Sequence, residues 1–171
     1  RKAGWLLLFN GKDLNGWRAS GSAYAGYGKW IVEDGTIGLC LYGGFAKYVS
    51  SIHLKNEREF ERSILQLDFK TSSNPGGAHS GVILRTGDPK RVEQTTLEVA
   101  IYGAGARPGH YCTGAFRHDL QAPSRNACKP AGEWNRMMIT VDQGAVTVEI
   151  NGEKVNRIAF NEWATPGKRP D

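Results

Sequence analysis

Residues 5–17 read WLLLFNGKDLNGW, and this stretch carries the strongest indication of the fold class. An apolar run ends at the turn-forming pair Asn10-Gly11, and a second such pair, Asn15-Gly16, leads directly into Trp17. Short apolar runs bounded by Asn-Gly pairs are typical of strands followed by tight turns. The stretch therefore predicts one buried strand, a turn and an aromatic anchor, a combination that many all-β proteins carry.

Alternation of apolar and polar residues with a period of two recurs along the chain, as antiparallel strands with one buried face require. Leu65, Leu67 and Phe69 share one face of such a segment. The pair Asn151-Gly152 is one that tight hairpin turns favour. Strands are expected at residues 63–70, 81–85 and 95–102 and, as a meander, at residues 134–155. Several short strands with turns between them predict an antiparallel β-sandwich in one domain.

The composition limits the classes of function. A chain of 171 residues can bury a core without disulfide bonds or metals. The net charge is +5, but the lysines and arginines are scattered, so we expect a solvated surface and no nucleic-acid partner. No apolar run is long enough to cross a bilayer as a helix, so no membrane-spanning segment is expected. The chain begins at Arg1 without Met, which is compatible with a processed N-terminus and with export.

Cysteines and histidines give no metal-binding pattern. Cys40, Cys112 and Cys128 lack the spacing of a metal site, and no two histidines are three to five residues apart. Cys112 and Cys128 are either bridged in an oxidising compartment or buried as inert thiols, and both alternatives stay open. A divalent metal such as Ca²⁺ remains compatible with the loop oxygens of Asp88, Asp119 and Asn126.

Further short motifs follow the opening stretch in a characteristic order. They are KWIVEDG at 29–35, HSGVILR at 79–85, LEV at 97–99, HYCTGA at 110–115, KPAGEWN at 129–135 and VEING at 148–152. Over nearly the whole chain, this ordered set resembles the 3-keto-disaccharide hydrolase family. The resemblance implies an all-β fold, a concanavalin A-like lectin/glucanase sandwich or jelly roll. One position departs from it, because the family commonly has Asn where His79 precedes Ser80-Gly81.

The end of the chain also departs from the resemblance. Family members usually continue with strands that return to the sandwich, whereas this sequence stops in the loop-like residues 167–171. We therefore expect one sandwich domain over residues 1–171 that lacks its C-terminal strands. A protein partner at the open edge is an alternative source of those strands, since an unpaired sheet edge is prone to aggregation. Family members are often exported, so the resemblance implies a periplasmic or extracellular location.

The resemblance implies a carbohydrate-active enzyme that cleaves 3-keto-glycosides. A ketone at carbon 3 acidifies the hydrogen at carbon 2, so a base can form an enolate, the leaving sugar is eliminated, and water adds back. This route needs a base, a donor or cation for the enolate oxygen, and an acid for the leaving group. Two alternatives use the same scaffold: a non-catalytic glycan-binding module, and an accessory or structural subunit of a larger assembly. Hydrolysis by two carboxylates is disfavoured, because Glu93 and Glu98 would face opposite sides of one strand.

Glu98 is the expected catalytic base. It alternates with the apolar residues Leu97 and Val99, so its side chain points away from the core. Arg85 ends a neighbouring strand, and a cross-strand ion pair between Glu98 and Arg85 without a function is the structural alternative. For the other needs of this route, we expect enolate stabilisation by Arg85 and Lys129 and proton donation by His110 or His79. Several tyrosines in glycine-rich segments have rings that can stack on sugars: Tyr24, Tyr27, Tyr42, Tyr102 and Tyr111. The expected sugar-binding residues are His79, Tyr102, Tyr111 and Thr113.

Overall fold

The computed structural model describes residues 4–21, 28–41, 52–71, 79–85, 96–103, 109, 111–117 and 120–163. Within these ranges the regular secondary structure is all strand except for one short helix, α2 (Phe160–Trp163). The chain divides into two compact units, Arg1–Phe60 and Glu61–Asp171. The prediction of a single domain over the whole chain therefore stays a prediction. In the part of the chain described, no helix is long and apolar enough to cross a membrane.

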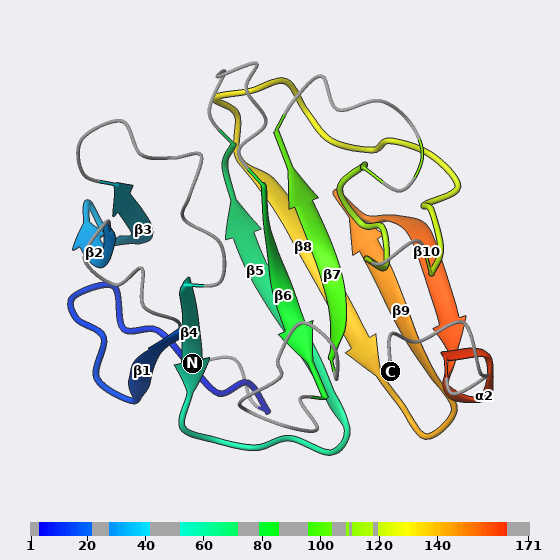
Figure 1. Ribbon diagram of the computed structural model, residues 1–171, viewed down its shortest axis with the longest axis horizontal. Coiled ribbons are helices and arrows are strands. Elements are labelled where there is room, and N and C mark those ends of the chain that lie inside the picture. Colours follow the sequence, from blue (N-terminus) through cyan, green and yellow to red (C-terminus); the bar gives the residue numbers. More distant parts are fainter. Residues whose placement is uncertain are drawn as a thin grey trace. The chain divides into compact units, whose positions relative to one another are not determined.

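The first unit contains two antiparallel strand pairs (Figure 1). The pairs are β1 (Trp17–Gly21) with β4 (Ile52–Asn56), and β2 (Gly28–Glu33) with β3 (Thr36–Leu41). The turn between β2 and β3 places Asp34 and Gly35 at positive φ, 49° and 71°. Two consecutive residues of this kind form the tight hairpin turn that Asp-Gly pairs favour.

The opening stretch does not form the buried strand that its apolar run predicts. Residues 5–9 adopt no strand conformation, and Leu7 is 66% exposed. No described strand pairs with these residues, so their backbone has no ladder to join. The aromatic anchor is confirmed, because Trp17 begins β1 and its indole Nε1 donates to the carbonyl oxygen of Leu8 at 2.8 Å.

The second unit contains a four-stranded antiparallel sheet in the order β10-β9-β8-β5, and a separate β6–β7 hairpin pair (Figure 1). The bounds are β5 (Ser63–Phe69), β6 (His79–Leu84), β7 (Leu97–Tyr102), β8 (Asn135–Val141), β9 (Ala145–Ile150) and β10 (Glu153–Ala159). These strands confirm the four strand-forming segments predicted from alternation. The predicted turn is also present, with Asn151 and Gly152 at φ values of 53° and 85°.

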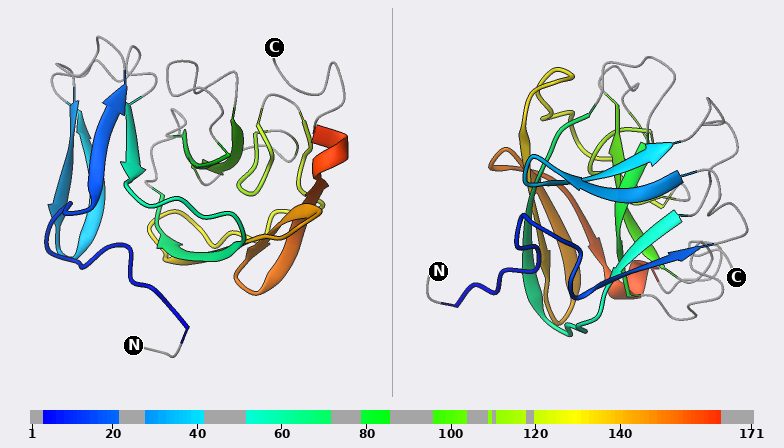
Figure 2. Two further views of the ribbon diagram at one scale, coloured as in Figure 1. Left: turned by 90° about the horizontal axis from the view of Figure 1, so that it is seen from below. Right: turned by 90° about the vertical axis from the view of Figure 1, so that its left-hand side faces the viewer.

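The apolar faces of the two strand groups of this unit enclose one core. Leu97 and Val99 of β7 meet Met137 and Ile139 of β8 in the same buried cluster, and all four are fully buried. Figure 2 shows β6 and β7 as a layer over the sheet of β5, β8, β9 and β10. Two antiparallel layers around a shared core form a β-sandwich, so the predicted fold class is confirmed.

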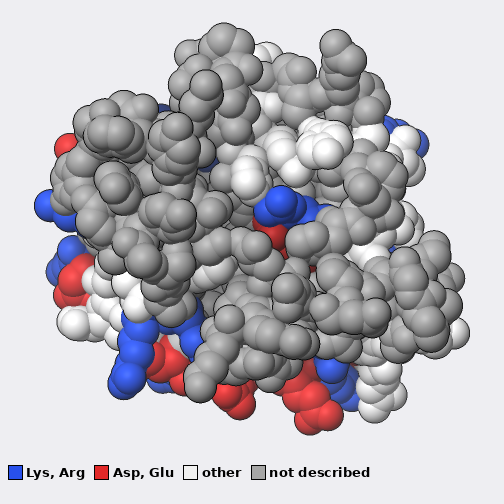
Figure 3. Space-filling view, in the orientation of Figure 1, with Lys and Arg blue, Asp and Glu red and all other residues white. Residues whose placement is uncertain are grey.

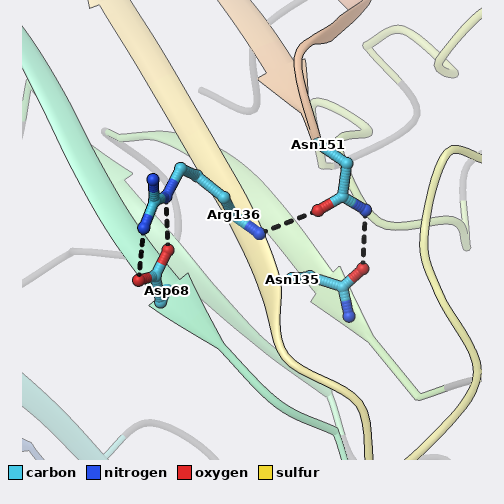
Figure 4. Close-up of polar contacts among 4 residues, drawn as sticks. All are labelled: Asp68, Asn135, Arg136 and Asn151. Carbon is cyan, nitrogen blue, oxygen red and sulfur yellow. Dashed lines mark hydrogen bonds and ion pairs between the residues drawn. The ribbon is translucent and has the colours of Figure 1, made fainter.

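Polar side chains support the sheet next to this core. Arg136 faces Asp68 across β8 and β5, with Nε–Oδ1 and Nη2–Oδ2 distances of 2.7 and 2.9 Å (Figure 4). The Arg136 hydrogen bond lowers the pKa of Asp68. Beside this pair, the buried Asn135 accepts hydrogen bonds from Asn151 Nδ2 at 2.9 Å and from the backbone N–H of Lys129 at 2.8 Å. The loop that carries Lys129 is thereby attached to the sheet.

Gly114→Ala is expected to destabilise the fold. Gly114 has a φ of +88°, and an added Cβ would lie 2.9 Å from Cγ2 of Val155. The segment cannot easily shift, since the Gly114 N–H donates to Ala100 and its carbonyl accepts from Asn156, both at 2.9 Å. Left-handed strain and overpacking together should lower the free energy of unfolding by about 2–4 kcal/mol in a urea titration. Gly144→Ala, where nothing lies within 4 Å, is the control, and an equally small loss for both variants would contradict the prediction.

Candidate functional site

β6 and β7 carry a second face, opposite to the core. In the register of this pair, His79 lies across from Tyr102, Gly81 from Ala100, and Ile83 from Glu98. Side chains alternate along each strand, so Glu98, Tyr102 and His79 share the face that points away from the core. The Glu98 side chain is 12% exposed, which shields its carboxylate from most of the solvent. Three of the predicted site residues are therefore gathered on one strand pair.

The cation beside Glu98 is Arg117, which the sequence analysis did not single out. Its Nη1 lies 3.2 Å from each carboxylate oxygen of Glu98 and 2.7 Å from Nε2 of His79. A guanidinium only donates hydrogen bonds, so Nε2 of His79 accepts. Figure 3 shows a basic and an acidic group side by side over β6 and β7, near the centre of the view.

Backbone pairing places Arg117 at this position. Residues 113–117 run along the edge of β7 that β6 leaves open, and the Arg117 N–H donates to the Glu98 carbonyl at 3.1 Å. Two further bonds, from Ala100 to Ala115 and from Gly114 to Ala100, have lengths of 2.9 Å. Sequence reasoning missed Arg117 because no local signal shows which loop residues pair with this edge.

Three rings in contact with one another adjoin Arg117 through His79, and we call them the aromatic platform: His79, Tyr102 and Tyr111. Tyr102 stacks on His79 with ring centroids 5.5 Å apart and an interplanar angle of 24°. Tyr111 meets Tyr102 edge-on at 5.9 Å and 72°, and is 67% exposed. Thr113 fixes the backbone of Tyr102. Its Oγ1 accepts a hydrogen bond from the Tyr102 N–H at 3.0 Å and donates one to the Tyr102 carbonyl at 3.2 Å. The predicted sugar-binding residues thus form one contiguous group.

A pocket of about 210 Å³ adjoins the platform. Tyr102 and Thr113 belong to its wall as well as to the platform group. Lys129, a predicted site residue, also lines the pocket and is exposed. Other wall residues are Phe69, Thr71, Cys112, Asn126, Cys128 and Pro130. The structure therefore places Lys129 in the pocket wall, whereas the ion pair of Glu98 is made with Arg117.

The two cysteines of the pocket wall are free thiols. Burial is the main cause that raises the pKa of both Cys112 and Cys128. A side-chain hydrogen bond with Thr113 partly offsets the rise in the pKa of Cys128. Of the two alternatives that the sequence leaves open, the structure shows the unbridged thiols, and both stay protonated at neutral pH.

Arg85 does not join Glu98. Alternation along β6 would place Arg85 on the same face, but its φ of 51° breaks the extended backbone just after the strand. Its guanidinium carbon lies 4.2 Å from the centroid of the Phe160 ring, while the ion pair of Glu98 goes to Arg117. The Glu98–Arg85 ion pair considered from the sequence is therefore not formed. His110 lies outside the described residues.

No metal site is visible in the described ranges, where no three His, Cys, Asp or Glu side chains gather to hold an ion. Of the loop oxygens considered from the sequence, Oδ1 of Asn126 already accepts the Cys128 N–H at 3.0 Å. Asp88 and Asp119 lie outside the described residues. The divalent metal stays an open expectation.

The arrangement combines three chemical capacities. The shielded Glu98 carboxylate can accept a proton, and the fixed Arg117 guanidinium can stabilise an oxygen that gains negative charge beside it. The aromatic platform presents ring faces of the kind that pack against the apolar faces of other rings. Together these groups form a binding surface with a base and an oxyanion partner at its edge.

Solved structures with this fold include two crystal structures described as putative glycosyl hydrolases from Parabacteroides distasonis. One, at 1.70 Å resolution, is 24% identical, with a TM-score of 0.69 over 92% of this chain and 74% of the other. The second, at 2.00 Å resolution, is 22% identical, with a TM-score of 0.63 over 91% of this chain and 83% of the other. At identities below 25%, this similarity supports a shared fold and carries no conclusion about activity.

A curated relative, the 3-keto-disaccharide hydrolase of Bacteroides thetaiotaomicron, is 26% identical over 179 residues. The match covers 94% of this chain and 59% of the relative, so the chain spans about three-fifths of the relative's length. Residues 4–170 match the sequence family described as 3-keto-alpha-glucoside-1,2-lyase-like domains. Since the match extends over almost the whole sequence, this chain belongs to that family.

Proposed function

We propose that the protein is a carbohydrate-active enzyme that cleaves 3-keto-glycosides by proton abstraction at carbon 2, elimination and hydration. The observation that carries the proposal is the shielded Glu98 carboxylate, paired with Arg117, which in turn contacts His79 of the aromatic platform. The description of the family and the name of the Bacteroides relative support the substrate class. Elimination followed by addition of water gives the same products as hydrolysis.

Glu98 acts as the base in this proposal. Its ion pair with Arg117 is a contact of the carboxylate form, which is the form that accepts a proton. The contacts of Arg117 with Glu98 and His79 are made through Nη1, so Nε and Nη2 carry the donors for the oxygen at carbon 3. That oxygen becomes negative as the enolate forms, and a donor aimed at it lowers the barrier.

The proton for the leaving sugar comes from a histidine in this proposal. His79, whose Nε2 lies 2.7 Å from Nη1 of Arg117, is one candidate donor. His110 is the other donor that the sequence analysis names. Tyr102 and Tyr111 bind the sugar through their ring faces, and Thr113 keeps Tyr102 in position. The cation that the sequence analysis assigned to Arg85 is supplied by Arg117.

A non-catalytic glycan-binding module is the second candidate function. The observation that favours it is the exposed ring of Tyr111 at the edge of the platform. Exposed tyrosines next to further rings suit sugar binding without any chemistry. The two candidates differ in what happens to the bound sugar, so one experiment that measures both binding and cleavage separates them.

The test is incubation of the protein with a 3-keto-disaccharide in D₂O, followed by NMR of the products. We expect release of the free sugar and one deuterium at carbon 2 of the keto sugar, since the proton added after elimination comes from solvent. A sample without protein corrects for spontaneous breakdown. Release without deuterium at carbon 2 would exclude the elimination route, and saturable binding without release would support the glycan-binding module.

Gly81→Ala is expected to lower turnover while the fold is kept. The Glu98 side chain lies over Gly81, and an added Cβ would be 2.8 Å from Cγ and 2.9 Å from Cδ of Glu98. The carboxylate must therefore move, and a displacement of about 1 Å at a catalytic group costs about 10²-fold in rate. Turnover and circular dichroism are compared with Gly144→Ala as the control. Wild-type turnover by Gly81→Ala would show that the position of Glu98 is unimportant.

A further inference from the structure

The pocket next to the platform is continuous with the candidate site. Tyr102 stacks on His79 on one side and lines the pocket as well. Thr113, which bonds both the N–H and the carbonyl of Tyr102, is part of the same wall. A ligand that covers the platform therefore reaches the wall of the pocket at Tyr102.

The pocket wall combines ring surfaces with hydrogen-bonding groups. Phe69 and Tyr102 supply apolar surface, Thr71 supplies a hydroxyl, and Lys129 supplies an ammonium group. Lys129 is exposed, and within the part of the chain that the structure describes its ammonium makes no ion pair or hydrogen bond. By contrast, Oδ1 of Asn135 is already used by Asn151 and by the Lys129 backbone. Lys129 is thus available to a ligand, whereas Asn135 shapes the wall.

The size of the pocket suits one ring of a disaccharide. Pockets that hold a whole drug-sized ligand have volumes of about 300–1,000 Å³, and this one has about 210 Å³. The chemistry at Glu98 acts on carbon 2 of the oxidised ring, and the bond that breaks is at carbon 1. The ring beyond that bond is therefore one glycosidic link away from Glu98.

We propose that this pocket is the site of the leaving sugar, and that Lys129 binds a hydroxyl of that sugar. The inference rests on the proposed function and extends it, because it predicts a preference for disaccharides whose second unit is a single hydroxyl-rich ring. Lys129 acts in this role on the leaving sugar, and Arg117 acts on the oxidised ring.

The first test compares two substrates that share the oxidised ring, a 3-keto-disaccharide and a methyl 3-keto-glucoside. Lys129→Met is expected to lower the ratio of their kcat/KM values, disaccharide over methyl glycoside, about tenfold, as loss of one charge-assisted hydrogen bond implies. Lys154→Met is the matched control, because Lys154 lies on β10 across from Glu149 and is exposed. It should leave the ratio unchanged.

The outcomes separate the two proposals. If the wild type cleaves neither substrate, the proposed function fails. If it cleaves both and Lys129→Met leaves the ratio as in the wild type, the leaving-sugar site fails while the proposed function stands.

A second measurement does not depend on turnover. Cys128 lies in the pocket wall and is partly exposed, whereas Cys112 is 1% exposed. Free glucose at millimolar concentration should slow the modification of Cys128 by methyl methanethiosulfonate severalfold, as followed by peptide mass spectrometry at mildly alkaline pH. Cys112 is the internal control, because its buried thiol can be modified only when the fold opens. An unchanged rate at Cys128 would overturn binding of the sugar in this pocket.

Discussion

Glu98→Gln is expected to lower kcat for a 3-keto-disaccharide by about 10²–10⁴-fold, the usual contribution of a positioned base. The amide has nearly the same shape but cannot take the proton from carbon 2. Its carbonyl oxygen still accepts a hydrogen bond from Arg117, whose Nη1 lies 3.2 Å from both carboxylate oxygens in the wild type. The fold should therefore be kept, and steady-state kinetics together with a thermal unfolding curve measure both properties.

Glu149→Gln is the matched control for this change. Glu149 alternates with the buried residues Val148 and Ile150 of β9, so it lies on the face of the sheet that points away from the core. Its replacement should leave kcat unchanged. Wild-type turnover by a folded Glu98→Gln variant would remove Glu98 from the role of base.

Arg117→Met is expected to lower kcat by about 10²–10³-fold, since it removes the donor for the enolate oxygen. It also leaves the shielded Glu98 carboxylate and the Nε2 atom of His79 without their shared partner. Stability should fall as well, by about 1–3 kcal/mol for a buried group left unsatisfied. Kinetics and urea unfolding are measured side by side.

Two further variants separate the chemical role of Arg117 from its structural one. Arg117→Lys keeps a positive charge but loses the planar fork, so it should recover part of the stability and little of the rate. Arg157→Met changes an exposed arginine on β10 and is the control. If Arg117→Met reduces stability yet turns over substrate as fast as Arg157→Met, Arg117 is a structural residue only.

Much of the fold could be predicted because its signals are local. Alternation within β5 and the Asn151-Gly152 turn depend on neighbouring residues, and both are present as expected. The strand expected at residues 5–9 failed because an apolar run forms a strand only when another strand pairs with it. Apolar character alone does not supply that partner.

The site was predicted in part. Glu98, His79 and Tyr102 share one face because alternation places them there, and alternation can be read from the sequence. Tyr111 was named for a ring that can stack on sugars and Thr113 lies in the same HYCTGA motif, and the structure brings both to Tyr102. These residues are gathered as the sequence analysis expected, while their roles in catalysis and binding remain proposals.

The sequence by itself determined the strands of the second unit, the Asn151-Gly152 turn, the sandwich class and the family. Only the tertiary structure decided which arginine meets Glu98. A positive φ at Arg85 ends the alternation that would have brought it to Glu98, and the pairing of residues 113–117 with β7 brings Arg117 there instead. Alternation and turn preference act between neighbours along the chain, whereas an ion pair depends on hydrogen bonds between segments that are distant in sequence.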